Sequence, residues 1–295
     1  MLELRSSSAY KESTPMIMRF RAAFVTGLRD AVRLRLALPL YLAGLLIALV
    51  QSWPVLVSAG NGQLRQINIE RLLTSGDALL ELFTKQETAA VAGTWLLLAP
   101  LLSMLYGACY NLFSGGILSV WAGTRRFWPG SVHFFWSFTG LGLVLVILAL
   151  VVTGLGSALV VALGTTAGAV TTFAVLQLLN LVGEYARALG VTRERRNPFA
   201  LFGGAVTFIV RHPVALLLGL LGLALHVALV AMYLGLAPQF GASPLAIILN
   251  QVLVFVWLWV KLLRLAWAHG LVASDTATQP QFVTEPGATS APVGF

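Results

Sequence analysis

A carboxylate, Glu184, stands near the end of the apolar stretch LQLLNLVGEYARALG, which begins at Leu176. Polar side chains recur in this stretch in steps of three, four and three residues, which places them on one face of a helix: Gln177, Asn180, Glu184 and Arg187. Ionisable groups in long apolar segments are costly and often mark function. Glu184 could form a structural ion pair, or it could handle a proton or a cation in a transport path.

A second polar stripe, closer to the C-terminus, could supply the partner of Glu184. Its members also follow helical spacing: Asn250, Val254, Trp257, Lys261 and Arg264. Glu184 and Lys261 lie at nearly the same distance from the turns that precede their stretches. The pattern therefore predicts an ion pair of Glu184 with Lys261 or with Arg264. Arg187, one helical turn from Glu184, is a further possible partner.

His226 lies in the middle of the apolar stretch GLALHVALVAMY, on the face that also carries Gly219, Gly222 and Tyr233. No second His, Cys or carboxylate stands three or four residues away, as a metal site on one helix would require. A neutral histidine that is hydrogen-bonded across helices is the favoured interpretation, and no metal site is predicted.

Other small and polar residues are interpreted as packing positions. One stripe of this kind is Ser103, Gly107, Tyr110 and Ser114, and small residues allow helices to approach closely. The SGG segment at Ser114 lacks the lysine and the spacing of a phosphate-binding loop. The chain also has no G-x-S-x-G or H-E-x-x-H motif and no acid/base carboxylate pair within the apolar segments. We expect neither an enzyme nor a bound cofactor.

Composition identifies the class of protein. The 295 residues are 58% hydrophobic and only 10% charged, whereas soluble domains carry roughly a quarter of charged residues. Six stretches are long enough to cross a hydrocarbon core of about 30 Å, which needs roughly 20 residues. We predict an all-α polytopic membrane protein whose six transmembrane helices form three hairpins, at residues 36–57, 94–118, 140–163, 168–188, 213–235 and 244–267.

The distribution of basic residues predicts the orientation. Sixteen of the 19 Lys and Arg residues lie on one side of the predicted spans, and this side is cytoplasmic by the positive-inside rule. Both termini are then cytoplasmic, in a bacterial inner membrane. The net charge of +8 is spread over the flanks of apolar segments and forms no single patch, so nucleic acid is not an expected partner.

The predicted domains follow from these spans. Residues 1–35 form a basic cytoplasmic N-terminus with an amphipathic interfacial helix, and residues 36–267 form the transmembrane domain, including an amphipathic outer-face loop at 60–92. Residues 274–295 are predicted to be a disordered cytoplasmic tail. The arginines of RFRAAFVTGLRDAVRLR suit anionic lipid headgroups, although they could also serve only to set the topology.

An internal repeat is a further prediction. A shift of 178 residues aligns FVTGLRDAVRLRLALPLYLAGLL with FGGAVTFIVRHPVALLLGLLGLA, with Phe24 matching Phe202 and Arg33 matching Arg211. The segment FWPGSVHFFWSF, before the third span, has the same order of features. Each predicted hairpin would then be preceded by an interfacial cytoplasmic helix.

The segments NLFSGGIL, FWPGSVHFFWSF and GEYARALGV resemble uncharacterised bacterial six-span membrane families, some of which are grouped with the membrane domain of glycerophosphodiester phosphodiesterases. The resemblance covers most of residues 20–270 and implies a membrane module without assigned chemistry. We expect a non-enzymatic membrane-complex subunit or lipid-associated scaffold, with membrane lipids and a protein partner or a second copy as ligands. The alternative is a small permease for a solute, lipid or proton that uses the interior polar stripes.

Overall fold

The computed structural model describes residues 16–33, 36, 38–47, 50, 89–240 and 244–278. Regular structure in these ranges is helical, which confirms the predicted all-α class for this part of the chain. A short apolar helix, Leu38–Ile47, lies between the first two numbered elements. The numbered helices are α1 (Met16–Ala31), α5 (Ala89–Trp121), α6 (Phe127–Leu163), α7 (Thr165–Thr192), α8 (Pro198–Arg211), α9 (Pro213–Phe240) and α10 (Pro244–Thr278).

Five of the described helices are long and apolar enough to cross a membrane, as expected for a multi-pass membrane protein. Their apolar parts overlap predicted spans two to six and are Pro100–Trp121, Phe127–Ala162, Thr165–Thr192, Pro213–Met232 and Gln251–Thr276. The first predicted span, 36–57, is represented by the helix Leu38–Ile47, and ten helical residues extend about 15 Å. Apart from residues 36 and 50, the rest of that span and residues 60–88 of the predicted outer loop lie outside the described residues.

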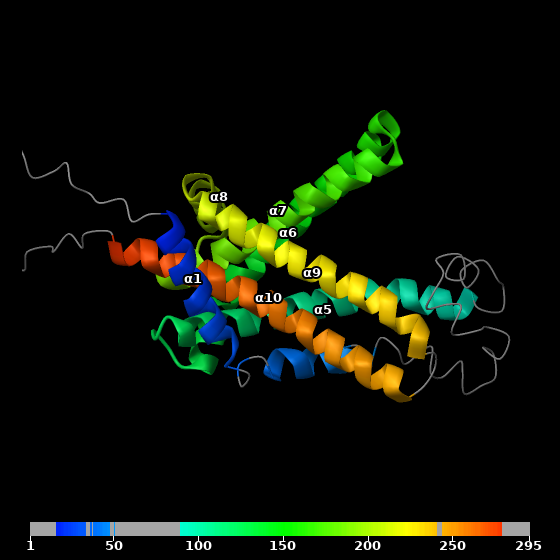
Figure 1. The fold of residues 1–295 in the computed structure, drawn as a ribbon, viewed down its shortest axis with the longest axis horizontal. Coiled ribbons are helices and arrows are strands. Elements are labelled where there is room, and N and C mark those ends of the chain that lie inside the picture. The colour runs from blue at the N-terminus through cyan, green and yellow to red at the C-terminus, as the bar shows by residue number, and fades with distance from the viewer. Residues whose placement is uncertain are drawn as a thin grey trace, which may run out of the picture.

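The long helices α5, α9 and α10 run along the long axis of the molecule (Figure 1). α10 packs against α1, α7 and α9, and α6 packs against α5 and α7. The ends of α6 and α7 that meet at Gly164 project away from the other helices, whereas α1, α8 and the C-terminal part of α10 gather at one end (Figure 1). We call this the basic end, because Arg193, Arg195 and Arg211 lie there.

The aromatic segment FWPGSVHFFWSF is not the separate interfacial helix that the sequence suggests. It forms the first turns of α6, which runs without a break for 37 residues. Pro129 stands in the first turn, where a missing N–H costs no helical hydrogen bond. Gly130 lets the segment pack directly on α5, since a Cβ there would lie 2.5 Å from the side chain of Ser119. Helix α6 therefore continues straight out of its contact with α5.

Helix α10 extends to Thr278, five residues into the segment that the sequence predicts to be disordered. Hydroxyl groups in this last part bond to the helix backbone: Ser274 Oγ donates to Leu271 O at 2.8 Å, and Thr276 Oγ1 donates to Val272 O at 3.0 Å. Asp275 also contacts two basic side chains, as described below. These contacts hold the final turns, and residues 279–295 lie outside the described part of the chain.

The apolar core lies toward the basic end. It includes the fully buried side chains of Phe134, Phe138 and Tyr185, and residues 181–191 of α7 are buried on every face. Helix α1 joins this core through Gly27, where a Cβ would collide with the indole of Trp267. The three segments that precede the predicted hairpins thus each pack on another helix: α1 on α10, α8 on α7, and the start of α6 on α5. These contacts do not test the threefold repeat, which stays a prediction.

Candidate functional site

Glu184 of α7 and Arg264 of α10 form an ion pair inside the bundle. The Nε atom of Arg264 lies 3.1 Å from Glu184 Oε1 and donates a hydrogen bond to Oε2 at 3.2 Å. The side chain of Glu184 is only 2% exposed and that of Arg264 is only 5% exposed. Of the partners that the sequence suggests for Glu184, Arg264 is the residue that makes the ion pair within the described structure.

Arg187 faces helix α5 and forms no ion pair with Glu184 in the described part of the chain. Its Nη2 donates to Asn111 Oδ1 at 2.9 Å, and its Nη1 donates to the Gly183 carbonyl at 3.2 Å. The guanidinium also lies over the ring of Tyr110, 5.0 Å from its centre. Arg187 therefore joins α7 to α5.

Lys261 of α10 is surrounded by aromatic rings. Its Nζ lies 4.0 Å from the ring centre of Tyr110, 5.4 Å from that of Tyr106 and 5.7 Å from that of Trp257. This is cation–π geometry. Among the described residues no carboxylate lies within ion-pair distance of Lys261, so the predicted Glu184–Lys261 pair is not formed.

These contacts bring four charged residues of two predicted stripes together between α5, α7 and α10. We call Glu184, Arg187, Lys261 and Arg264 the buried charge cluster, in which Lys261 is half-buried and the other three are buried. With every group in its ordinary charged form, the cluster holds one negative and three positive charges. Asn111, which accepts a hydrogen bond from Arg187 of this cluster, was missed by the sequence interpretation. Its spacing could have indicated it, because Asn111 lies on the same helical face as Gly107 and Ser114 of the predicted small and polar stripe.

The remaining predicted positions lie outside this cluster. Gln177 is half-buried and Asn180 is exposed, and both precede the stretch of α7, residues 181–191, that is buried on every face. The Nδ1 atom of His226 contacts the Gly222 carbonyl of its own helix at 2.9 Å, not a group on another helix as predicted, and its ring lies edge-on to Trp257 of α10 at 5.9 Å. Asn250 falls in α10, but its side-chain surroundings lie outside the description. No group of metal-ligand residues occurs among the described residues.

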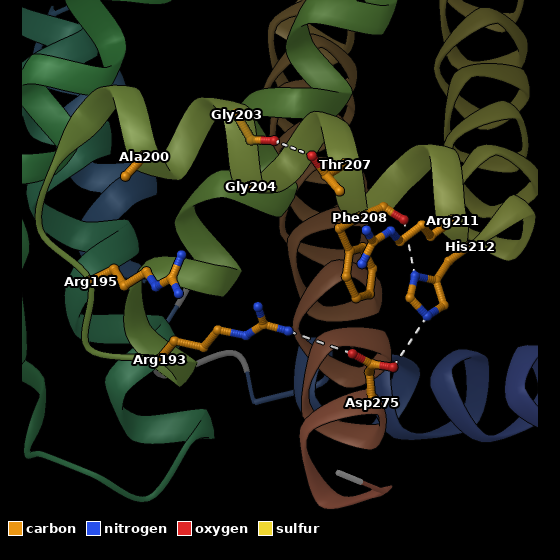
Figure 2. Close-up of a pocket in the computed structure, with 10 residues that line it drawn as sticks. All are labelled: Arg193, Arg195, Ala200, Gly203, Gly204, Thr207, Phe208, Arg211, His212 and Asp275. Carbon is orange, nitrogen blue, oxygen red and sulfur yellow. Dashed lines mark hydrogen bonds and ion pairs between the residues drawn. The ribbon is translucent and has the colours of Figure 1, made fainter. Parts of the chain in front are cut away.

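A pocket of about 480 Å³ opens at the basic end, between the α7–α8 loop, helix α8 and the last turns of α10 (Figure 2). Its charged and polar lining comes from all three segments: Arg193, Arg195, Thr207, Arg211, His212 and Asp275. Gly203, Gly204 and Ala200 supply a wall of small residues from α8. We call this the arginine pocket.

Local sequence explains the shape of this pocket. Asn197 caps α8 by accepting hydrogen bonds from the N–H groups of Phe199 and Ala200 at 3.0 and 3.3 Å, a preferred N-cap arrangement. Glu194 has a positive φ of 50° and pairs with Arg125 of the α5–α6 turn at 3.0 Å. These contacts hold the short loop whose neighbouring arginines line the pocket.

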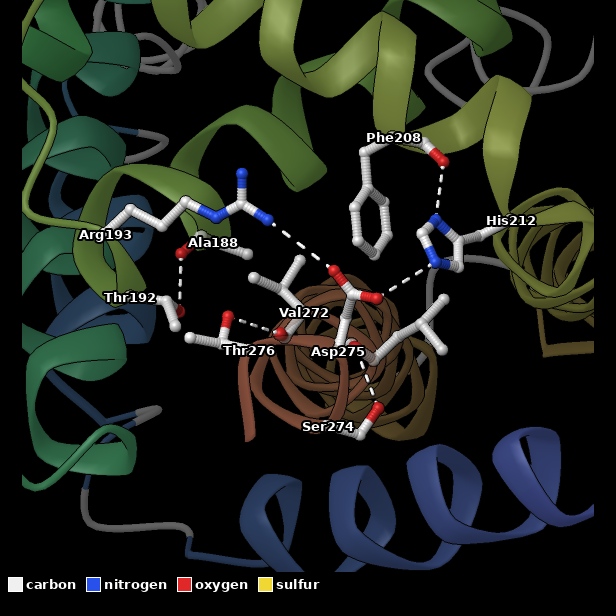
Figure 3. Close-up of polar contacts among 10 residues, drawn as sticks. Ala188, Thr192, Arg193, Phe208, His212, Val272, Ser274, Asp275 and Thr276 are labelled. Carbon is white, nitrogen blue, oxygen red and sulfur yellow. Dashed lines mark hydrogen bonds and ion pairs between the residues drawn. The ribbon is translucent and has the colours of Figure 1, made fainter. Parts of the chain in front are cut away.

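Asp275 connects two sides of the arginine pocket (Figure 3). Its Oδ2 lies 3.6 Å from Arg193 Nη2, and its Oδ1 lies 3.2 Å from His212 Nε2. The other ring nitrogen of His212 contacts the Phe208 carbonyl at 3.0 Å. A carbonyl and a carboxylate both accept hydrogen bonds, so both contacts are hydrogen bonds only when the imidazole carries two protons. The sequence interpretation missed Asp275 because it assigned this residue to a disordered tail.

Two arginines of the pocket remain free of such partners. Arg195 and Arg211 form no ion pair with any residue in the described ranges, and both are exposed. Figure 2 shows Arg193 directed at Asp275 across the pocket, with Arg195 beside it on the α7–α8 loop. Positive charge thus exceeds negative charge around an open cavity, which is an arrangement suited to an anion.

Comparisons with protein-family models, with curated proteins and with solved structures found no match to this chain. The resemblance to six-span bacterial families stays a prediction.

Proposed function

We propose that the chain is a six-span protein of a bacterial inner membrane, with both termini in the cytoplasm. We propose further that it acts without catalysis, as a lipid-associated scaffold or subunit of a membrane complex. The basic end would lie at the cytoplasmic leaflet, where anionic lipids attract Lys and Arg residues.

The observation that carries this proposal is a set of uncovered apolar side chains beside arginines at the basic end. On α8, Phe199 and Val210 are 73% and 78% exposed, and the exposed Arg211 directly follows Val210. Helix α1 exposes Ile17 and Met18 near Arg21 in the same way. Helices with such a surface lie in the membrane interface, with apolar groups among the acyl chains and arginines at the headgroups.

The start of α6 has a comparable surface, with the exposed Arg126 at its N-cap. Trp128 and Trp136 are 61% and 78% exposed, two turns apart on the helix. Tryptophan is enriched at the level of the headgroups. The interior supports a structural role as well, because the Glu184–Arg264 pair and the Arg187–Asn111 hydrogen bond join α5, α7 and α10 to one another.

Fluorescence quenching by brominated lipids tests this placement. The full chain is reconstituted into vesicles whose lipids carry bromine either near the headgroup or near the chain end. We expect the shallow label to quench Trp128 and Trp136, so the Trp128→Phe/Trp136→Phe variant should lose much of the shallow quenching and little of the deep quenching. Unchanged shallow quenching in this variant would contradict the interfacial placement.

The anionic-leaflet part of the proposal needs a separate comparison. Shallow quenching of the wild-type chain is measured in vesicles with and without an anionic phospholipid. Stronger shallow quenching with the anionic lipid, reversed by salt, supports the proposed role of the arginines. Identical quenching in both kinds of vesicle would indicate that those arginines set the topology only and do not bind anionic lipid.

A permease is the second candidate, and the buried charge cluster is the observation that favours it. Three cations around one carboxylate form a charged centre between helices of membrane-spanning length, and such residues often mark ion pathways. Ion or proton flux into vesicles that contain the full chain tests this function. Flux that Lys261→Met abolishes, with folding retained, would favour the permease over the scaffold.

A further inference from the structure

We propose that the arginine pocket binds the phosphate of an anionic phospholipid headgroup. This inference rests on the proposed membrane placement and adds a ligand class and a site to it. The pocket would hold one lipid in a defined position at the basic end, beyond the general attraction of arginines to an anionic surface.

The first argument is charge. Arg193 and His212 share the carboxylate of Asp275, at 3.6 and 3.2 Å, whereas Arg195 and Arg211 have no counter-charge among the described residues. An anion that enters the pocket would find a guanidinium group on either side that is not already held in an ion pair with a described residue. Guanidinium binds phosphate through paired, charge-assisted hydrogen bonds, which are stronger than neutral ones.

The second argument is space. A cavity of about 480 Å³ is within the usual range for small-ligand sites. The wall from α8 is low because Gly203 and Gly204 have no side chains, and a Cβ at Gly203 would meet no atom within 4 Å. The phosphate can therefore approach the helix backbone between the arginines.

The third argument selects a lipid over free phosphate. Helix α8 forms one wall of the pocket and carries the exposed apolar side chains of Phe199 and Val210. A ligand with a phosphate and acyl chains could occupy the arginines and cover these apolar groups together. A free phosphate would use only the arginines.

Native mass spectrometry of the full chain, purified in detergent and titrated with phosphatidylglycerol, tests the site. Two variants address it independently. Arg195→Gln/Arg211→Gln removes the unpaired charges, and Gly203→Phe fills the cavity without changing charge or meeting another atom at its Cβ. We expect each to weaken binding of the tightest lipid about tenfold or more, the arginine variant because it loses hydrogen bonds from charged groups and Gly203→Phe because its ring takes the space of the phosphate.

The matched control is Arg21→Gln/Arg29→Gln, which removes two exposed arginines of α1 and leaves the pocket intact. It should retain the tightest lipid. Equal losses in control and pocket variants would overturn the proposal, because they would indicate diffuse attraction only. Competition by inorganic phosphate at comparable concentration would overturn the choice of a lipid and leave a free-phosphate site.

The failure of this inference can be distinguished from failure of the proposed function. If the pocket variants bind phosphatidylglycerol as the wild type does, and brominated lipids still quench Trp128 and Trp136, the pocket inference is wrong and the membrane placement stands. If the wild type retains no anionic lipid and shows no shallow quenching, both are wrong. Retention of phosphatidylcholine equal to that of phosphatidylglycerol would also overturn the inference.

Discussion

The side chain of Arg264 crosses the bare backbone of Gly222 on its way to Glu184. A Cβ at Gly222 would lie 2.5 Å from Cγ and 2.6 Å from Cδ of Arg264. A side chain at position 222 would therefore occupy the space through which the arginine passes. Helix α9 contributes this space, although it contributes no charged group to the buried charge cluster.

Glu184→Gln is expected to destabilise the protein by about 3–5 kcal/mol, because it leaves the buried guanidinium of Arg264 without a counter-charge. The double variant Glu184→Gln/Arg264→Leu should recover much of this loss, since it removes the unpaired charge. Thermal unfolding of all variants in detergent measures the coupling between the two positions. Additive losses would show that the two residues contribute independently.

Gly222→Ala should lower the melting temperature, although alanine is the better helix former by roughly 1 kcal/mol. The added methyl group must displace Arg264 from Glu184. Gly154→Ala in α6 is the control, because a Cβ there meets nothing within 4 Å, and it should be neutral or stabilising. Similar effects at both glycines would contradict the close passage of Arg264.

Lys261→Met should leave stability unchanged or raise it. The variant removes a cation that has no ion-pair partner among the described residues and keeps a long side chain among the rings of Tyr106, Tyr110 and Trp257. Lys261 is half-buried, and replacing charges inside a protein by apolar groups of similar volume is often neutral or stabilising. A melting temperature that falls as far as in Glu184→Gln would instead make the cation–π contacts essential to the fold.

Asn197→Ala should destabilise the start of α8 by about 1 kcal/mol, the usual cost of losing an N-cap. Asn197→Asp should restore it, because a carboxylate can accept the same N–H hydrogen bonds. Amide hydrogen exchange of residues in the first turn of α8 reports this local effect. Equal exchange in the alanine and wild-type chains would show that the cap is not needed.

Asp30 of α1 predicts a pH dependence of stability. Burial raises the pKa of its carboxyl above the usual range, although the nearby charges of Arg33 and Arg29 act in the opposite direction. Because the folded state binds this proton more tightly than the unfolded state, the contribution is fully present below the unfolded pKa and is lost as pH rises through the folded pKa.

Asp30→Asn should therefore gain stability relative to the wild type as the pH rises from acid toward neutral. Melting temperatures of both chains across this interval measure the difference. Glu194→Gln is the control, because the Glu194 side chain is 58% exposed, and it should not reproduce the trend. A constant difference between Asp30→Asn and wild type at all pH values would contradict the prediction.

Much of the helical structure could be predicted from the sequence by itself. Hydropathy and the 3.6-residue period are local properties, so they identified the apolar helices from α5 to α10 and placed Glu184 and Arg187 on one face. The ends were less certain. The sequence does not show that the Trp128–Trp136 segment forms the first turns of α6 instead of a separate helix. That continuity depends on packing against α5, which local sequence does not contain.

The tertiary structure decided which groups meet. Helical spacing left Lys261 and Arg264 as alternatives for Glu184, and the choice depends on the space at Gly222 and on the aromatic rings around Lys261. Asn180 is exposed, one residue before the buried stretch of α7, and so lies outside the cluster despite its favourable spacing. Asp275 enters the arginine pocket because α10 continues past its apolar part, where composition alone resembles a tail. Such choices depend on contacts between distant segments, which local sequence patterns do not contain.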